Sequence, residues 1–160
     1  MRQKEALNQC FLATSNRCHA AVSDLSLSLN LPGERSKFMK ALSLVKPSGT
    51  RIASGEKTLE VRRWKPSLRA DEDLLIVENN RFLQNEGDED DEGRVVAIVR
   101  VATVRPFVPE DMAAACSSYF EDGWLAWVLV DVRPLYSTIN VKAARGIYEL
   151  HPPRDIKRSA

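Results

Sequence analysis

Residues 39–64, MKALSLVKPSGTRIASGEKTLEVRRW, decide the fold because they read as strand, turn, helix and strand in succession. Residues 39–45 alternate in polarity and predict a strand that enters the core. The Lys-Pro-Ser-Gly sequence that follows predicts a turn. We expect Ser48 to N-cap a short helix over residues 50–54, which Gly55 ends as the C′ residue.

The second strand of this stretch, residues 58–62, carries a polar face. Side chains two apart on a strand project to the same side, roughly 7 Å apart, so Glu60 and Arg62 share one face. With Lys57 just before the strand and Trp64 after it, this face can bind a planar ligand. Glu60 would accept from an amine, Lys57 would neutralise a phosphate or an oxyanion, and Trp64 would stack. The alternative is an ordinary exposed Glu–Arg pair.

The rest of the chain extends this β pattern. Residues 73–78 predict a buried strand, residues 94–104 the longest strand, and residues 86–93 an acidic, solvated hairpin connection between them. Two further strands are expected over residues 124–132 and 147–150, and a helix over residues 109–119 that begins at a proline.

Two or three short helices are too few to cover both faces of a parallel sheet. We therefore expect an α+β fold that is mainly β, a small β-barrel with short helices at its ends. The domain is predicted over residues 39–152. Residues 1–38 are expected to be either a poorly ordered arm or a segment upstream of a true start at Met39, and residues 153–160 a basic tail.

The amino-acid composition narrows the classes of protein to which this chain can belong. The chain is 44% hydrophobic and 28% charged, with no apolar run near the roughly 20 residues of a membrane span, which predicts a soluble cytoplasmic protein. Three cysteines in no C-x-x-C pair and two histidines predict neither a disulfide framework nor a structural metal, and no motif implies a cofactor. Six of the 22 acidic residues fall within residues 86–92, which leaves a basic body compatible with nucleic-acid contact.

Two motifs, in this order, resemble the ASCH family. Residues 41–64, with GEKTLEVRRW at their end, look like its opening signature. Residues 123–135, GWLAWVLVDVRPL, and residues 141–150, VKAARGIYEL, are similar to its closing pattern. The resemblance, to small bacterial ASCH proteins in particular, implies a PUA-like barrel whose cleft binds RNA or a nucleotide.

The ligand-binding residues expected on these grounds come from three segments. Ser48 would aim backbone N–H groups at an anion, and two basic residues would contact phosphate at the cleft rim. The full set is Ser48, Lys57, Glu60, Arg62, Trp64, Lys142 and Arg145.

The resemblance also implies two enzymatic alternatives, both using Lys57 and Glu60. One branch of the family removes the acetyl group of N4-acetylcytidine with a lysine matched by Lys57 and a threonine three residues later. This chain has Glu60 at that threonine position, and Thr58 is shifted to the other strand face, so Glu60 would have to act as a general base. Another branch is described as ribonucleases, a chemistry to which Tyr119 could contribute. A third alternative is a protein-interaction adaptor that uses the acidic loop.

Overall fold

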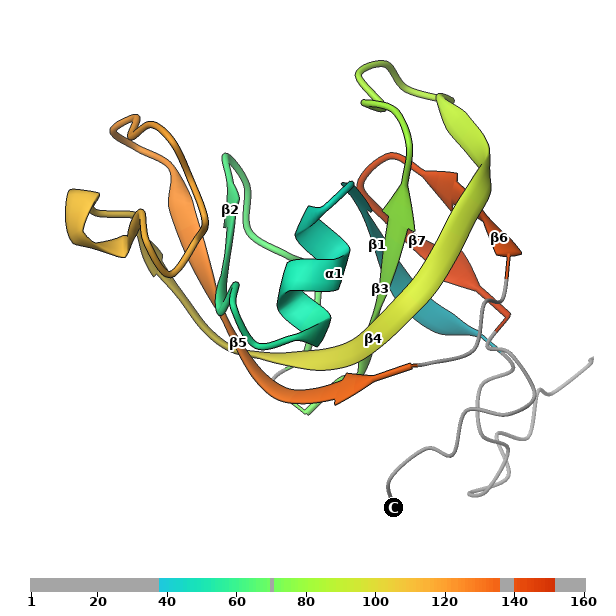
Figure 1. Ribbon diagram of the computed structural model, residues 1–160, viewed down its shortest axis with the longest axis horizontal. Coiled ribbons are helices and arrows are strands. Elements are labelled where there is room, and N and C mark those ends of the chain that lie inside the picture. The colour runs from blue at the N-terminus through green and yellow to red at the C-terminus, as the bar shows by residue number, and fades with distance from the viewer. Residues whose placement is uncertain (1–37, 70, 136–139, 152–160) are drawn as a thin grey trace, which may run out of the picture. The chain divides into compact units, whose positions relative to one another are not determined.

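The computed structural model describes residues 38–69, 71–135 and 140–151, which form a mainly β unit (Figure 1). Apart from Phe38, the predicted N-terminal arm lies outside the described residues, and so does the basic tail. The elements, in chain order, are β1 (Met39–Val45), α1 (Ser48–Ala53), β2 (Leu59–Arg62), β3 (Leu74–Asn79), β4 (Glu89–Pro106), the 3-10 helix η1 (Pro109–Asp111), β5 (Leu125–Pro134), β6 (Asn140–Ala144) and β7 (Ile147–Leu150).

The strands pair in the order β2-β5-β4-β3-β1-β7, and β6 pairs with β4 beside this path. β1 and β3 run parallel, and the other pairs are antiparallel. Within the described part of the chain, the two ends of the path, β2 and β7, do not pair with each other. The mainly β architecture is therefore as expected, but the sheet is not closed into the predicted barrel.

The curved sheet holds α1 on its concave side (Figure 1). Ile52 of α1 is fully buried and packs on apolar side chains of β1, β3, β4 and β5. A second cluster forms around Ala41, Leu75 and Val77, which alternate with the residues of the first cluster along their strands. Because both faces of the sheet are covered there, all six residues of β3 are buried.

Several sequence predictions are confirmed. The strands over residues 39–45 and 147–150 have the predicted bounds. The predicted strand 58–62 begins one residue later, at Leu59, and the predicted strand 73–78 is shifted by one residue to 74–79. Gly55 has a φ of +80° just beyond the helix, as expected of a C′ glycine. Ser48, however, is the first helical residue; Pro47 holds the N-cap position and no side chain caps the helix.

The predicted helix over residues 109–119 is wrong. Only Pro109–Asp111 is helical, as a 3-10 turn, and a run of turns follows to Cys116, whose φ is +50°. The carbonyl of Ala114 accepts from the backbone N–H groups of Thr58 and Leu59. Tertiary hydrogen bonds thus take an acceptor that a regular helix would keep for itself.

The acidic segment is also more structured than expected. β4 begins at Glu89, so four of the six acidic residues of the run belong to a strand that pairs with β6, an element not predicted from the sequence. Asp88 accepts from two backbone N–H groups of the connection, Gln84 and Asn85. The hydrogen bond from Asn85 is the main cause that holds the pKa of Asp88 below its usual value.

None of the described helices has the length and apolar composition needed to cross a bilayer.

The pairing of β6 with β4 depends on Gly93, so we expect Gly93→Ala to lower the free energy of unfolding by roughly 1–3 kcal/mol. A Cβ atom at this position would lie 2.7 Å from the backbone oxygen of Val141 and 2.9 Å from the Cβ of Ala143. Urea unfolding measures the change. Thr103→Ala, at an exposed position of the same strand, is the control, and an equal effect of both variants would contradict the close packing.

The segment after β4 is held by Asp111, which accepts from both Nη atoms of Arg105 at 2.5 and 2.7 Å and from the backbone N–H of Val108. The Arg105 hydrogen bonds lower the pKa of Asp111, so its stabilising effect is present above the unfolded pKa of about 4 and is lost as the pH falls through the folded value. We expect Asp111→Asn to be destabilised at pH 7 and to approach the unsubstituted protein below about pH 4. A pH-independent difference in thermal unfolding would refute this.

Candidate functional site

A cleft of about 780 Å³ opens between the end of β1, the strand β2 with its following loop, the end of β3 and the β6–β7 turn. Its walls come from residues 43–48, 60–67, 79–83 and 144–147, four segments that are far apart in the sequence. The parallel pairing of β1 with β3 brings the first and third of these segments together, because both strands end at the same edge of the sheet.

A buried chain of charges forms the base of one wall. Glu60 lies between two cations: its Oε2 is 3.2 Å from Nζ of Lys57, and its Oε1 accepts from Nε of Arg62 at 2.8 Å. Lys57 also donates to the backbone oxygen of Ala115 at 2.8 Å, which anchors the segment after η1 beneath β2. Both carboxylate oxygens of Glu60 are therefore occupied by cations of the protein itself.

Arg62 connects this chain of charges to the cleft. One of its terminal nitrogens, Nη2, lies 3.4 Å from the backbone oxygen of Ser43, and the Ser43 hydroxyl is hydrogen-bonded to the Tyr148 hydroxyl at 2.8 Å. Burial raises the pKa of Tyr148, which therefore stays a neutral partner of Ser43. Within the described residues, Nη1 of Arg62 has no hydrogen-bond partner and remains available to a ligand.

The cleft is strongly electropositive. Its lining includes one carboxylate, that of Glu60, and five cationic side chains: Lys46, Arg62, Lys65, Arg81 and Arg145. Most cations elsewhere in the described part of the chain have an acidic partner. Lys46, Lys65 and Arg145 form no ion pair among the described residues, so their charge is uncompensated at the cleft.

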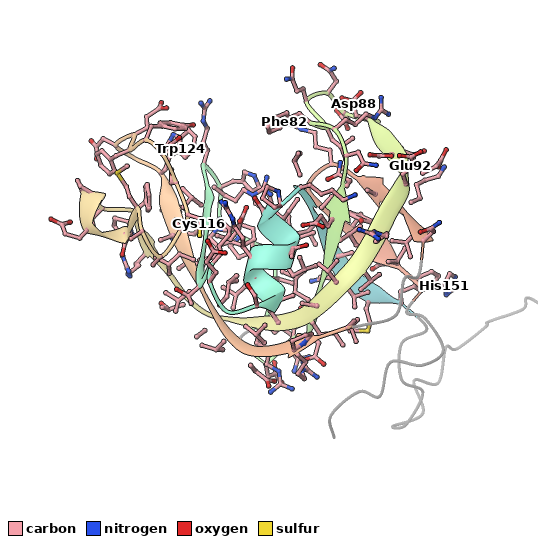
Figure 2. The ribbon with its side chains drawn as sticks, viewed as in Figure 1. Phe82, Asp88, Glu92, Cys116, Trp124 and His151 are labelled. Carbon is pink, nitrogen blue, oxygen red and sulfur yellow. The ribbon has the colours of Figure 1, made fainter. Side chains whose placement is uncertain are left out.

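Two partly exposed aromatic side chains also line the cleft. Trp64 is 37% exposed, and its ring contacts that of the buried Trp127 edge to face, with centroids 4.9 Å apart. Phe82 is 75% exposed on the β3–β4 connection (Figure 2). Exposed aromatic rings beside cations are the arrangement that stacks nucleobases next to bound phosphates.

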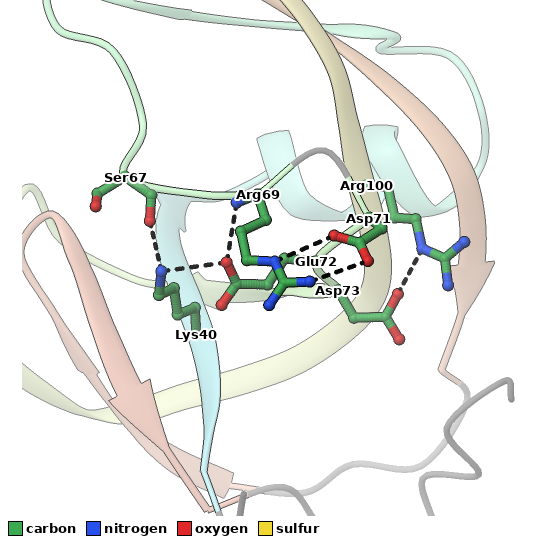
Figure 3. A network of polar contacts seen from close by, with 7 residues as sticks. All are labelled: Lys40, Ser67, Arg69, Asp71, Glu72, Asp73 and Arg100. Atoms are coloured by element: carbon green, nitrogen blue, oxygen red, sulfur yellow. Dashed lines mark hydrogen bonds and ion pairs between the residues drawn. The ribbon is translucent and has the colours of Figure 1, made fainter. Parts of the chain in front are cut away.

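The loop that carries Trp64 is tied to the sheet by a polar network (Figure 3). Lys40 of β1 donates to the backbone oxygen of Ser67 and pairs with Glu72 at 3.2 Å. Further along, Asp73 pairs with Arg100 of β4 at 2.9 Å. These contacts hold the middle and the far end of the loop against β1 and β4, and Nε1 of Trp127 in β5 donates to the backbone oxygen of Trp64 near the start of the loop at 3.2 Å.

The structure brings five of the seven predicted ligand-binding residues together in the cleft lining: Ser48, Glu60, Arg62, Trp64 and Arg145. Lys57 lies beneath the wall, 7% exposed, and touches Glu60 rather than the cleft. Lys142 is not in the lining and pairs with Glu89 at 2.7 Å.

Ser48 was expected to direct backbone N–H groups at the start of the helix toward an anion, and there the N–H of Thr50 donates to the carboxylate of Glu78 at 2.7 Å. Tyr119, the residue suggested for ribonuclease chemistry, is exposed and does not line the cleft.

Sequence reasoning missed several lining residues, above all Lys46, Asn79, Arg81 and Phe82. The one signal in the sequence was an Arg-Phe pair in a polar connection, where a large aromatic has no apolar neighbours to pack on. Among the residues that the structure describes, no three His, Cys, Asp or Glu side chains gather in a group that could hold a metal ion.

Because Glu60 is buried between cations, Lys57→Met should lower the free energy of unfolding by roughly 3 kcal/mol. Adding Glu60→Gln should restore part of this loss, since the buried charge left by the first substitution is then removed. Lys142→Met, which breaks an exposed pair, is the matched control and should change stability by less than about 1 kcal/mol. Equal losses in Lys57→Met and Lys142→Met in chemical unfolding would contradict the buried pair.

Comparison with known proteins gives a family and two similar structures of a single protein. The family model of the ASCH domain matches residues 42–139. The crystal structure of ASCH from Zymomonas mobilis is similar with a TM-score of 0.48 and 21% identity, over 64% of this chain and 73% of that chain. A tyrosine-to-phenylalanine mutant of the same protein gives a TM-score of 0.48 and 17% identity, over 64% and 76%.

No curated protein matches the chain. The family match covers more than half of the chain and includes β2, β3, β4 and β5. The chain therefore belongs to the ASCH domain family.

Proposed function

We propose that the cleft binds RNA, with the phosphate backbone held by the unpaired cations and bases stacked on the exposed aromatic rings. The observation that carries this proposal is the charge imbalance: Lys46, Lys65 and Arg145 have no acidic partner among the described residues, and the one carboxylate in the lining, Glu60, is already neutralised. Uncompensated cations repel one another, and a bound polyanion relieves that repulsion.

Membership of the ASCH domain family supports the same conclusion, since the family resemblance implies binding of RNA or nucleotides. The aromatic residues add to it. Trp64 and Phe82 expose their rings at a cleft whose volume suits a nucleotide, about 780 Å³. An anion site that took only inorganic phosphate would gain nothing from these rings.

The geometry supports recognition better than hydrolysis. As a general base, Glu60 would need a free oxygen facing the substrate, but Lys57 and Arg62 occupy both oxygens. As an oxyanion donor, Lys57 would need access to the cleft, but its side chain is buried and bonded to the backbone of Ala115.

An adaptor role for the acidic loop has less support. Within that loop Asp90 accepts from the backbone N–H groups of Asn80 and Glu92, and Asn80 also donates to Glu92. The hydrogen bond from Glu92 is the main cause of the lowered pKa of Asp90. These acids thus have a role in shaping the connection that carries Phe82.

The proposal predicts RNA binding that weakens with salt and depends on the cleft cations. In fluorescence anisotropy with a labelled single-stranded RNA, replacing Lys46 and Arg145 by Gln should reduce the slope of log Kobs against log salt by about 0.7 for each phosphate that the variant no longer neutralises. Arg69→Gln removes an exposed cation outside the cleft lining and should leave the slope unchanged. Identical slopes for all the variants would place the RNA elsewhere, and no binding at any salt concentration would refute the proposed function.

A further inference from the structure

Asn79, the last residue of β3, has a buried oxygen without a partner. The residue lines the cleft and is 1% exposed. Its Nδ2 donates to the backbone oxygen of Arg81 at 2.6 Å, but within the described residues its Oδ1 has no hydrogen-bond partner. Exchanging the two amide atoms would place an oxygen against the Arg81 carbonyl, so the orientation of the amide is fixed by chemistry.

A buried acceptor without a partner, on a residue that lines a cleft, indicates that the protein alone does not supply its hydrogen-bond donor. Buried polar groups are nearly always hydrogen-bonded, and those that are not are frequently completed by a ligand or an ordered water. The hydrogen bond to Arg81 holds the amide in place, and because Oδ1 itself is buried, a ligand donor reaches it only when neighbouring side chains of the cleft wall shift. The cationic side chains of the same cleft can only donate, so Oδ1 is an acceptor for an N–H group of the ligand.

The position of this acceptor beside Phe82 suggests what the donor is. Phe82 is three residues further along the chain and Trp64 is on the facing loop, and both rings line the same cleft as Asn79. A base stacked on either ring would bring its polar edge, rather than its phosphate, to the wall of the cleft.

We propose that the cleft selects an unpaired base with an exocyclic amine (adenine, cytosine or guanine), whose amine donates to Oδ1 of Asn79; this rests on the proposed binding of RNA. The amine of a paired base is already used for pairing, and the A-form groove does not admit side chains to it, so the base must be unpaired. Uracil carries carbonyl oxygens on both sides of its one N–H, and one of them would meet the Asn79 oxygen.

The test removes the amine from the ligand and leaves the protein intact. Single-stranded oligomers of adenosine, cytidine, uridine and purine riboside, which is adenosine without its amine, would be compared at one salt concentration, each of roughly ten nucleotides. We expect the adenosine and cytidine oligomers to bind about fivefold more tightly than those of uridine and purine riboside, the gain typical of one neutral hydrogen bond per site.

Asn79→Ala completes a double-mutant cycle with these ligands. The variant should bind adenosine and purine riboside oligomers equally, with the salt slope of the unsubstituted protein, because the phosphate contacts are unchanged. If this buried substitution prevents folding, the comparison of ligands on the unsubstituted chain decides the question alone.

The outcomes separate the two proposals. Salt-dependent binding of all four oligomers with equal affinity would overturn the selection of an amine and leave RNA binding in place. Equal binding of an adenosine–uridine duplex and the adenosine oligomer would overturn the requirement for an unpaired base. Failure of the unsubstituted chain to bind any of these RNAs would overturn the proposed function, and the selection of an amine with it.

Discussion

Every residue of β3 is buried, and the hydrogen bonds that most polar groups at its end form with neighbouring segments place two walls of the cleft. Glu78 accepts from the backbone N–H and the hydroxyl of Thr50, which fixes α1 against the sheet. The contact requires Gly49, where a Cβ atom would lie 2.9 Å from that of Glu78. The backbone oxygen of Asn79 accepts from the N–H of Lys46 and its side chain donates to Arg81, so this residue joins the first wall to the third.

The charged side chains of the site fall into two groups, those that pair with one another within the fold and those that remain open to a ligand. Burying Glu60 between Lys57 and Arg62 satisfies the carboxylate, so the one acidic side chain in the cleft lining is already paired. The remaining cations, Lys46 and Arg145 among them, are exposed and unpaired within the described chain. An ion pair would stabilise the free protein slightly, but exposed pairs contribute only about 0–1 kcal/mol, so leaving these charges open costs little and keeps them available to phosphate.

The sequence was most informative where one local pattern determined the outcome. The alternation over residues 58–62 predicted that Glu60 and Arg62 share the polar face, and both line the cleft, although Val61 of the other face lines it as well. Lys57 was predicted to face the cleft, but it does not. The residue precedes the strand, and its buried amine donates to the backbone oxygen of Ala115, 58 positions along the chain. Such a contact depends on the tertiary fold and cannot be predicted from the spacing of residues near Lys57 in the sequence.

The same limit explains the missed elements. β6, with the sequence NVKAA, has too little alternation to read as a strand and exists because β4 extends to Glu89 to pair with it. The run over residues 109–116 has the composition of a helix, yet its carbonyls bond to β2 and Lys57. Asn79 and Phe82 were missed because an acceptor without a partner and an exposed ring point to a ligand only once they are seen to line one cleft with residues of β1 and β2.

The central claim, that RNA lies in this cleft with its bases against the two rings, is tested most directly by ultraviolet cross-linking of a single-stranded RNA to the whole chain, followed by mass spectrometry of the peptides. The account predicts cross-links at Trp64 and Phe82, which are exposed in the cleft, and none at Tyr119, which is more exposed than Trp64 but does not line it. Cross-links confined to Tyr119 or to other residues away from the cleft would contradict the account.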